Sequence, residues 1–195
     1  MWKRFRAALV RFAVRRAAAC QRHAPKRAAV WLRLACSWTP AFGEAYVALV
    51  HLSRAMEDRW GALATAQEAT ERFPENPDAW MLLGDASQMV FRQREALGAY
   101  EQALALEERS DAAVAAGRLY RRAGRHAEAA SRFARAYAAG GGTEALWLNA
   151  QALFQAGDIK AADEALHLWA TQKPGGMERL SEVRAELLAG KRDGC

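Results

Sequence analysis

The sequence predicts an all-α protein, an α-solenoid of stacked helix–turn–helix repeats. Two observations predict this class: the composition is that of a helical chain, and several columns of residues recur along it at intervals of 33 or 34 residues. The 195 residues are rich in alanine, leucine, arginine and glutamate, which favour helices, and include only five prolines. Hydrophobic residues make up 52% and charged residues 26%, a balance that argues against wholesale disorder.

The period is visible in several independent columns. One column of alanines recurs at intervals of 34, 34, 33 and 33 residues: Ala28, Ala62, Ala96, Ala129 and Ala162. The same offsets align a second column: Leu32, Ala66, Tyr100, Phe133 and Leu166. They also align a third: Phe12, Tyr46, Trp80, Ala113 and Leu146. Alanines alone could align by coincidence in such a chain, so the agreement between columns is what makes the signal strong.

These columns resemble the tetratricopeptide repeat, a helix–turn–helix unit of about 34 residues with the pattern W-x2-L-G-x2-Y…A-x3-F…P. The clearest unit is 77–109, with these residues in the family's places: Trp80, Leu83, Gly84, Ala96, Tyr100 and Ala103. Three further units, 43–76, 110–142 and 143–175, keep parts of the pattern. The resemblance implies four such repeats in a right-handed α-solenoid, with the first helices of the repeats lining a concave face.

The segments on either side of these repeats are expected to complete the array. Residues 1–42 form a basic amphipathic N-terminal segment with a degenerate repeat, in which Arg15 and Arg16 stand where leucine and glycine belong. Residues 176–195 are expected to be a capping helix and a polar tail, because apolar residues recur every three or four positions from Met177 to Leu187. A solenoid needs such a cap, with a polar outer face, at its open end.

The residues that chemistry would need do not gather in a recognisable pattern. The four histidines have no HxxxH or HExxH spacing, and the three cysteines have no CxxC spacing. GxSxG, HRD-like and paired-carboxylate motifs are absent as well. We therefore expect no enzymatic activity and neither a metal ion nor a cofactor. The unpaired cysteines favour a reducing, cytoplasmic location, and the sequence has no apolar run of about 18 residues that would predict a transmembrane helix.

The expected function is that of a protein–protein interaction adaptor or scaffold. In the first helices of the four clear units, Val47, Met81, Val114 and Trp147 form an apolar row with polar residues one turn further on. Such a row suits a partner peptide or helix bound in the concave groove, although a solvated inner face with incidental apolar residues is the alternative. The remaining groove positions are His51, Arg54, Asp85, Gln88, Met89, Arg118, Arg121, Arg122, Gln151 and Phe154. The three arginines near position 120 predict a partner segment that is apolar and acidic.

The N-terminal segment has a charge balance of its own. Residues 1–43 hold ten lysines and arginines and no acid, whereas the remaining residues hold eighteen bases and all 22 acids. Trp2, Phe5, Leu9 and Phe12 recur at three- and four-residue spacing, with cations on the other faces, which is typical of an interfacial amphipathic helix.

Two interpretations of this segment stay open. The stripe could cap the first repeat, or the segment could engage an anionic membrane surface or an acidic protein; nucleic acid is not expected, because the rest of the chain is acidic. Membrane binding would make the chain a peripheral subunit or assembly factor of a secretion, export or biogenesis complex, on the inner membrane face. The residues of this surface would be Trp2, Lys3, Arg4, Phe5, Arg6, Arg11, Arg15 and Arg16.

Overall fold

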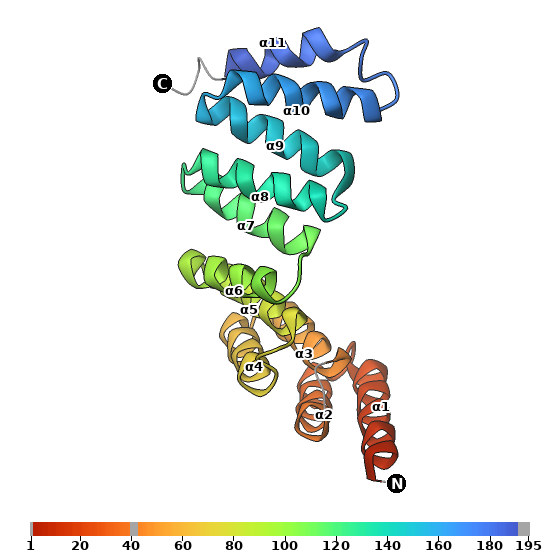
Figure 1. Ribbon diagram of the computed structural model, residues 1–195. Coiled ribbons are helices and arrows are strands. Elements are labelled where there is room, and N and C mark those ends of the chain that lie inside the picture. The colour runs from red at the N-terminus through yellow and green to blue at the C-terminus, as the bar shows by residue number, and fades with distance from the viewer. Residues whose placement is uncertain (1, 40–42, 191–195) are drawn as a thin grey trace. The chain divides into compact units, whose positions relative to one another are not determined.

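Helices account for all the regular structure in the computed structural model (Figure 1). It describes residues 2–39 and 43–190, and of Trp2, Lys3, Arg4 and Gly190 it describes the backbone only. These residues form eleven helices and no strand, which confirms the predicted all-α class. The chain divides into two compact units at the end of α6, one up to Leu106 and the other from Glu107. The repeat length does not change there, so the period gives no sign of the division.

The first unit consists of three helical pairs that pack in the order of the sequence. They are α1 (Trp2–Cys20) with α2 (Pro25–Trp38), α3 (Glu44–Ala55) with α4 (Arg59–Arg72), and α5 (Pro77–Met89) with α6 (Gln93–Leu106). The degenerate repeat therefore forms a complete helical pair. Ala13 and Ala17 of α1 are buried in the core of the unit, while Arg15 and Arg16 are exposed. Small side chains allow the close approach of helices for which the family's leucine and glycine are otherwise used.

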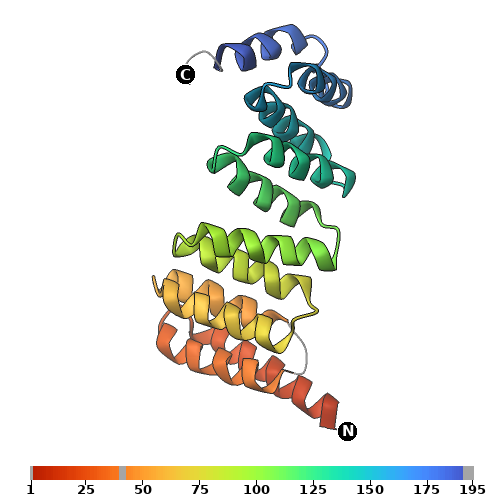
Figure 2. The ribbon, with the colours of Figure 1, turned by 60° about the vertical axis from the view of Figure 1, so that its left-hand side comes forward.

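The second unit consists of two helical pairs and a final helix; Figure 2 shows their course along the chain. They are α7 (Ser110–Arg122) with α8 (His126–Ala138), α9 (Gly142–Ala156) with α10 (Ile159–Gln172), and α11 (Leu180–Gly190). The last helix is the predicted cap: it packs on α10 and α9, and its Val183 is buried against Leu166 and Trp169. It begins three residues later than expected, because Met177 lies in the preceding turn and is half exposed.

An ion pair fastens the cap to α10. The Arg184 guanidinium donates to both carboxylate oxygens of Asp163, at 2.6 and 2.7 Å. These hydrogen bonds hold the pKa of Asp163 below its usual range. Among the described helices, none is both long and apolar enough to cross a lipid bilayer.

A polar contact ties the first helical pair to the second. Arg72 of α4 donates to the carbonyl oxygen of Cys36 and to the hydroxyl of Tyr46, both at 2.6 Å, and the Tyr46 hydroxyl donates to Glu68. Burial raises the pKa of the Tyr46 hydroxyl, and burial likewise raises the pKa of the Cys36 thiol to about 12. Both groups therefore keep their protons at neutral pH, and the hydroxyl stays available as a hydrogen-bond donor.

The glycine and aromatic columns of the repeat meet within the helical pairs. A Cβ atom at Gly84 of α5 would lie 2.4 Å from the ring of Tyr100 on α6, and one at Gly117 of α7 would lie 2.6 Å from the ring of Phe133 on α8. Both rings are fully buried. The physical reason for the two columns is therefore one contact: the ring of the second helix lies directly on the backbone of the first.

The turns inside the pairs share a left-handed residue. Glu57, Phe91, Gly124 and Gly157 follow one another at intervals of 34, 33 and 33 residues and have φ angles of 61°, 62°, 72° and 90°. Glycine adopts this conformation without a steric penalty, whereas a bulky side chain is strained in it. The first unit therefore carries backbone strain at two turns where the second unit has glycine.

We expect Phe91→Gly to raise the free energy of unfolding by about 0.5 to 1 kcal/mol. Relief of the left-handed strain outweighs the extra entropy of glycine in the unfolded chain, and little packing is lost because Phe91 is 78% exposed. The midpoint of urea unfolding checks this. Gly124→Ala is the matched control and should lower the midpoint, since its Cβ would meet nothing within 4 Å and only the backbone would be strained. A lower midpoint for Phe91→Gly would contradict the assignment of strain.

Candidate functional site

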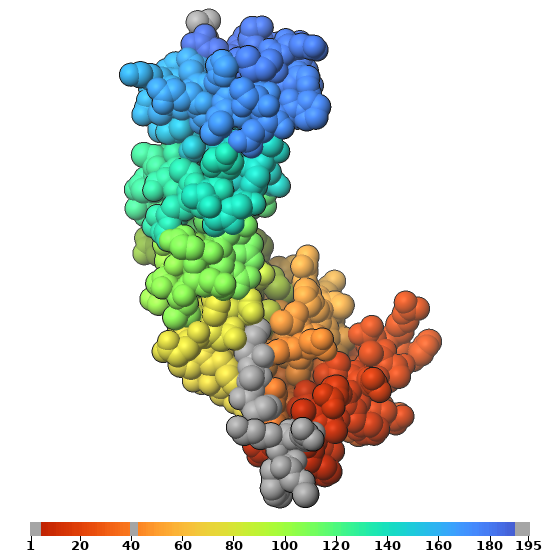
Figure 3. Space-filling model, turned by 45° about the vertical axis from the view of Figure 1, so that its right-hand side comes forward, coloured from red at the N-terminus to blue at the C-terminus, as the bar shows by residue number. Residues whose placement is uncertain are grey.

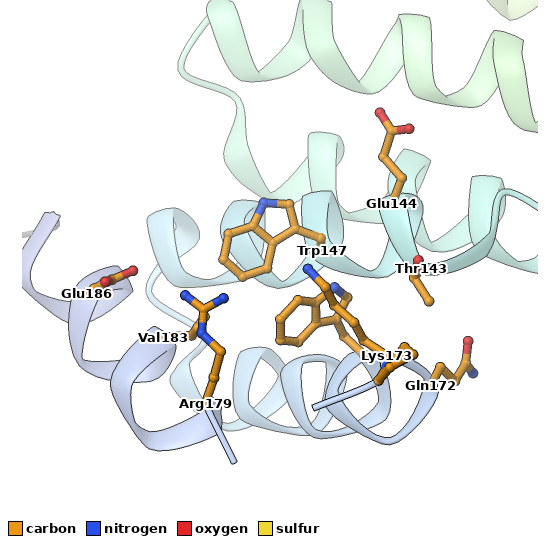
Figure 4. A pocket seen from close by; sticks show the side chains of 10 residues that line it. Thr143, Glu144, Trp147, Gln172, Lys173, Arg179, Val183 and Glu186 are labelled. Atoms are coloured by element: carbon orange, nitrogen blue, oxygen red, sulfur yellow. The ribbon is translucent and has the colours of Figure 1, made fainter. Parts of the chain in front are cut away.

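An open pocket lies between α9, α10 and α11 of the second unit (Figure 4). Its volume is about 430 Å³. Helix α9 contributes Thr143, Glu144 and Trp147, and α10 contributes Trp169 and Gln172. The loop after α10 and the cap contribute Lys173, Pro174, Arg179, Val183 and Glu186. The first helix of a repeat and the capping helix thus form two of its walls.

Two tryptophans form the apolar wall of this pocket. The rings of Trp147 and Trp169 have their centroids 5.2 Å apart and their planes at 40°. Trp169 is almost fully buried and belongs to the same core cluster as Leu166 and Val183, while Trp147 is half-buried against that cluster. Core packing therefore fixes the position of both rings, and part of the Trp147 surface stays open to a ligand.

Four charged side chains surround the tryptophans. Lys173 lies over the Trp169 ring, with its Nζ 4.8 Å from the ring centroid. Arg179 and Glu186 stand on the cap side, and Glu144 accepts a hydrogen bond of 2.9 Å from Arg118 of α7. Lys173 forms no ion pair with any carboxylate in the part of the chain that the structure describes. Its charge is therefore available to an incoming group beside the aromatic wall.

The groove residues predicted in the second unit have different surroundings. Trp147 lines the pocket, and Val114 of α7 is half-buried. Arg118 is engaged with Glu144, and Arg121 donates to Gln151 at 3.2 Å. Arg122, on the last turn of α7, is exposed.

The prediction that Phe154 faces the groove is wrong. Phe154 is 2% exposed and belongs to the core cluster with Leu146 and Leu166. The equivalent positions of earlier repeats hold Arg54, Gln88 and Arg121, whose polar groups stay at the surface. An apolar ring gains by turning into the core at the same position.

The predicted groove residues of the first unit lie on α3 and α5. Val47, Met81 and Met89 are half-buried, and Met89 packs against the core; His51 and Arg54 are exposed.

The polar groove residues of α5 are tied to a buried tyrosine. The Tyr100 hydroxyl donates to Asp85, and the Gln88 amide donates to the same hydroxyl, both at 2.6 Å. Asp85 and Gln88 are thus held by the core of their own repeat.

The N-terminal stripe is not a cap for the first repeat as the first interpretation requires. Phe5 and Phe12 are both more than half exposed, and the buried face of α1 is made of Ala13 and Ala17 instead. The cations of α1 at positions 6, 11, 15 and 16 are exposed, while the side chains of Trp2, Lys3 and Arg4 lie outside the described part of the chain.

Several pocket residues were not identified from the sequence. Trp169 was expected only to pack between repeats, and Lys173, Arg179 and Glu186 were not singled out. Arg179, Val183 and Glu186 are four and three residues apart, a spacing that places them on one side of the capping segment. That spacing was a usable signal, but it needed the knowledge that the cap packs back onto α9. Among the described residues, no three histidine, cysteine, aspartate or glutamate side chains gather so that they could hold a metal ion.

Comparisons with known proteins identify the fold. No protein-family model and no curated protein matches the sequence. The crystal structure of MamA matches with a TM-score of 0.69 and 16% identity, over 90% of this chain and 96% of that one. YrrB, described as a TPR protein with an unusual peptide-binding site, matches at 0.61 and 19%, over 83% of this chain and 89% of its own.

TTC0263, a thermophilic TPR protein of Thermus thermophilus, matches with a TM-score of 0.57 and 18% identity, over 94% of this chain and 99% of that one. At such identities the likeness concerns the fold. It confirms that the chain has the helical-repeat fold of tetratricopeptide repeat proteins, as the recurring columns predicted.

Proposed function

We propose that this chain, which has the fold of tetratricopeptide repeat proteins, is an interaction adaptor that binds a segment of a partner protein in the pocket of α9, α10 and α11. The observation that carries the proposal is the Trp147–Trp169 wall, which is fixed by the core and open on one side. Tryptophan is among the residues that contribute most to binding energy at protein interfaces. The published description of YrrB as having a peptide-binding site supports a role of this kind for the fold.

The pocket favours a segment with a large apolar side chain and a nearby carboxylate. A volume of about 430 Å³ lies within the range of ligand sites and can hold one aromatic or large aliphatic side chain with its neighbours. That side chain would pack on Trp147, and the carboxylate would pair with Lys173, which has no carboxylate partner among the described residues. Arg118 is a weaker candidate for selecting acidic residues, because Glu144 already engages it.

A selected peptide provides the test of this site. A random peptide library is displayed and selected on the immobilised chain, and the enriched peptide is measured by calorimetry. We expect Lys173→Glu to weaken its binding at least about tenfold, since it places a negative charge beside the ligand's carboxylate. Lys160→Glu is the matched control: it makes the same charge change at the exposed start of α10, away from the pocket, and should bind like the wild type.

Trp147→Ala tests the aromatic wall and should cost about 2 kcal/mol or more of binding free energy. It should also lower thermal stability, because Trp147 is half-buried and lies against Trp169. Binding is therefore measured well below the melting transition, with circular dichroism as the check on folding. Selected peptides that bind both pocket variants as tightly as the wild type would place recognition elsewhere on the chain.

A further inference from the structure

The N-terminal hairpin of α1 and α2 exposes large apolar side chains on both helices. Phe5 and Phe12 of α1 are 58% and 53% exposed, and Val30 and Leu34 of α2 are 58% and 38% exposed. Phe12 meets the half-buried Trp31 of α2 edge to face, with ring centroids 5.9 Å apart, so the exposed groups of the two helices are continuous. We call these five residues the hairpin face. Side chains of α1, in red, stand on the outer surface in Figure 3.

Cations accompany this apolar surface. Arg27 precedes Val30, Trp31 and Leu34 by three, four and seven residues and therefore shares their side of α2. The guanidinium of Arg16 lies 5.9 Å from the centre of the Trp31 ring. Arginine at the edge of an aromatic surface keeps its charge in water while its stem covers apolar area.

The charge of the hairpin is not neutralised by its surroundings. Residues 1–43 contain no acid. Asp58 shares a small pocket with Lys26 and Arg33, and Glu68 shares another with Arg33, yet no cation of α1 or α2 forms an ion pair with a carboxylate in the described residues. The hairpin thus presents apolar and positively charged groups together, with no opposing charge of its own.

We propose that the hairpin face binds the surface of an anionic lipid bilayer. Aromatic and aliphatic side chains insert at the boundary between headgroups and acyl chains, and the neighbouring arginines and lysines contact lipid phosphates. No helix of the described residues could span the bilayer, so the contact is peripheral. This surface lies in the first unit and is independent of the proposed peptide pocket in the second.

Charge complementarity favours a lipid surface over the other occupants. The matching face of a second copy carries the same positive charge, so a symmetric contact would be repulsive. An acidic protein would have to present a carboxylate opposite each cation of two helices, whereas an anionic bilayer offers negative charge at every lateral position. The apolar groups, spread over both helices, likewise suit a laterally extended surface.

The proposal is tested by co-sedimentation of the full chain with phosphatidylcholine vesicles, with and without phosphatidylserine, at low and high salt. We expect binding to the anionic vesicles that weakens as salt rises. Phe5→Ser with Phe12→Ser should reduce partitioning about tenfold for each ring, because each ring loses its burial in the interface. Arg15→Glu with Arg27→Glu should reduce it more than about twentyfold, since each lost cation alone accounts for about fivefold.

Matched controls come from the same unit. Trp60→Ser with Phe91→Ser removes two exposed aromatic side chains outside the hairpin face, and Arg59→Glu with Arg94→Glu makes the same change in net charge. Both control variants, and Lys173→Glu of the pocket, should bind vesicles like the wild type. All variants are at exposed positions, and circular dichroism checks that each remains helical.

Three results would overturn the proposal. The first is equal binding to neutral and anionic vesicles without salt dependence. The second is anionic binding that the control variants lose as fully as the hairpin variants. The third is no vesicle binding, together with self-association in sedimentation velocity that the hairpin variants abolish; this would assign the face to the acidic body of a second copy.

Discussion

Replacing Tyr100 by alanine is expected to lower the free energy of unfolding by about 3 to 5 kcal/mol. The side chain is fully buried, its ring lies on the backbone at Gly84, and its hydroxyl bonds to Asp85 and Gln88. Alanine would leave a cavity in the middle of the first unit and remove both hydrogen bonds. Urea unfolding followed by far-ultraviolet circular dichroism measures the change.

Tyr100→Phe separates the ring from the hydroxyl. It keeps the packing and removes the hydrogen bonds, so we expect a loss of only about 1 kcal/mol, because Asp85 is exposed and water can replace the donor. If Tyr100→Ala left the unfolding midpoint unchanged, the contact between the two repeat columns would not be the basis of the core.

Gly84→Ala should destabilise the chain by about 1 to 3 kcal/mol, even though alanine is the better helix former. Its Cβ atom would lie 2.4 Å from the Tyr100 ring, a distance that forces the buried ring or the helix to move. The matched control is Gly98→Ala on α6, where a Cβ would meet nothing within 4 Å. That substitution should stabilise by up to about 1 kcal/mol, because only helix propensity changes.

The double variant Gly84→Ala/Tyr100→Leu identifies the cause. The smaller leucine leaves room for the new methyl group, so Gly84→Ala should cost less in this background than alone. An equal cost in both backgrounds would show that something other than the ring opposes a side chain at position 84.

The helical pairs could be predicted because each repeat column reflects a contact within one pair. Tyr100 and Gly84 are sixteen residues apart, and the turn between them is short, so a local pattern encodes their meeting. The pocket is different: it requires α11 to return onto α9, and the spacing within α11 does not say which helix it meets. Trp147 was identified because it lies on a repeated row, whereas Lys173 lies in a loop without a counterpart in the pattern.

The N-terminal helix shows where an amphipathic pattern is ambiguous. Two sides of α1 are apolar, one with Phe5 and Phe12 and the other with Ala13 and Ala17. Spacing alone favours the aromatic stripe as the buried side, since it is the more hydrophobic. The alanines are buried instead, because a close helix–helix contact has room for small side chains and leaves bulky rings outside.

The capping helix has a double position whose consequence is thermodynamic. Val183 closes the apolar core of the second unit, and the same residue lines the pocket together with Arg179 and Glu186. A segment bound in the pocket therefore contacts α11 only when that helix is docked, so docking of the terminal helix and ligand affinity form one linked equilibrium. Each tenfold excess of ligand over its dissociation constant then adds about 1.4 kcal/mol to the closed end of the array. Recognition and the integrity of the last repeat would be regulated together, by anything that loosens or secures a single helix.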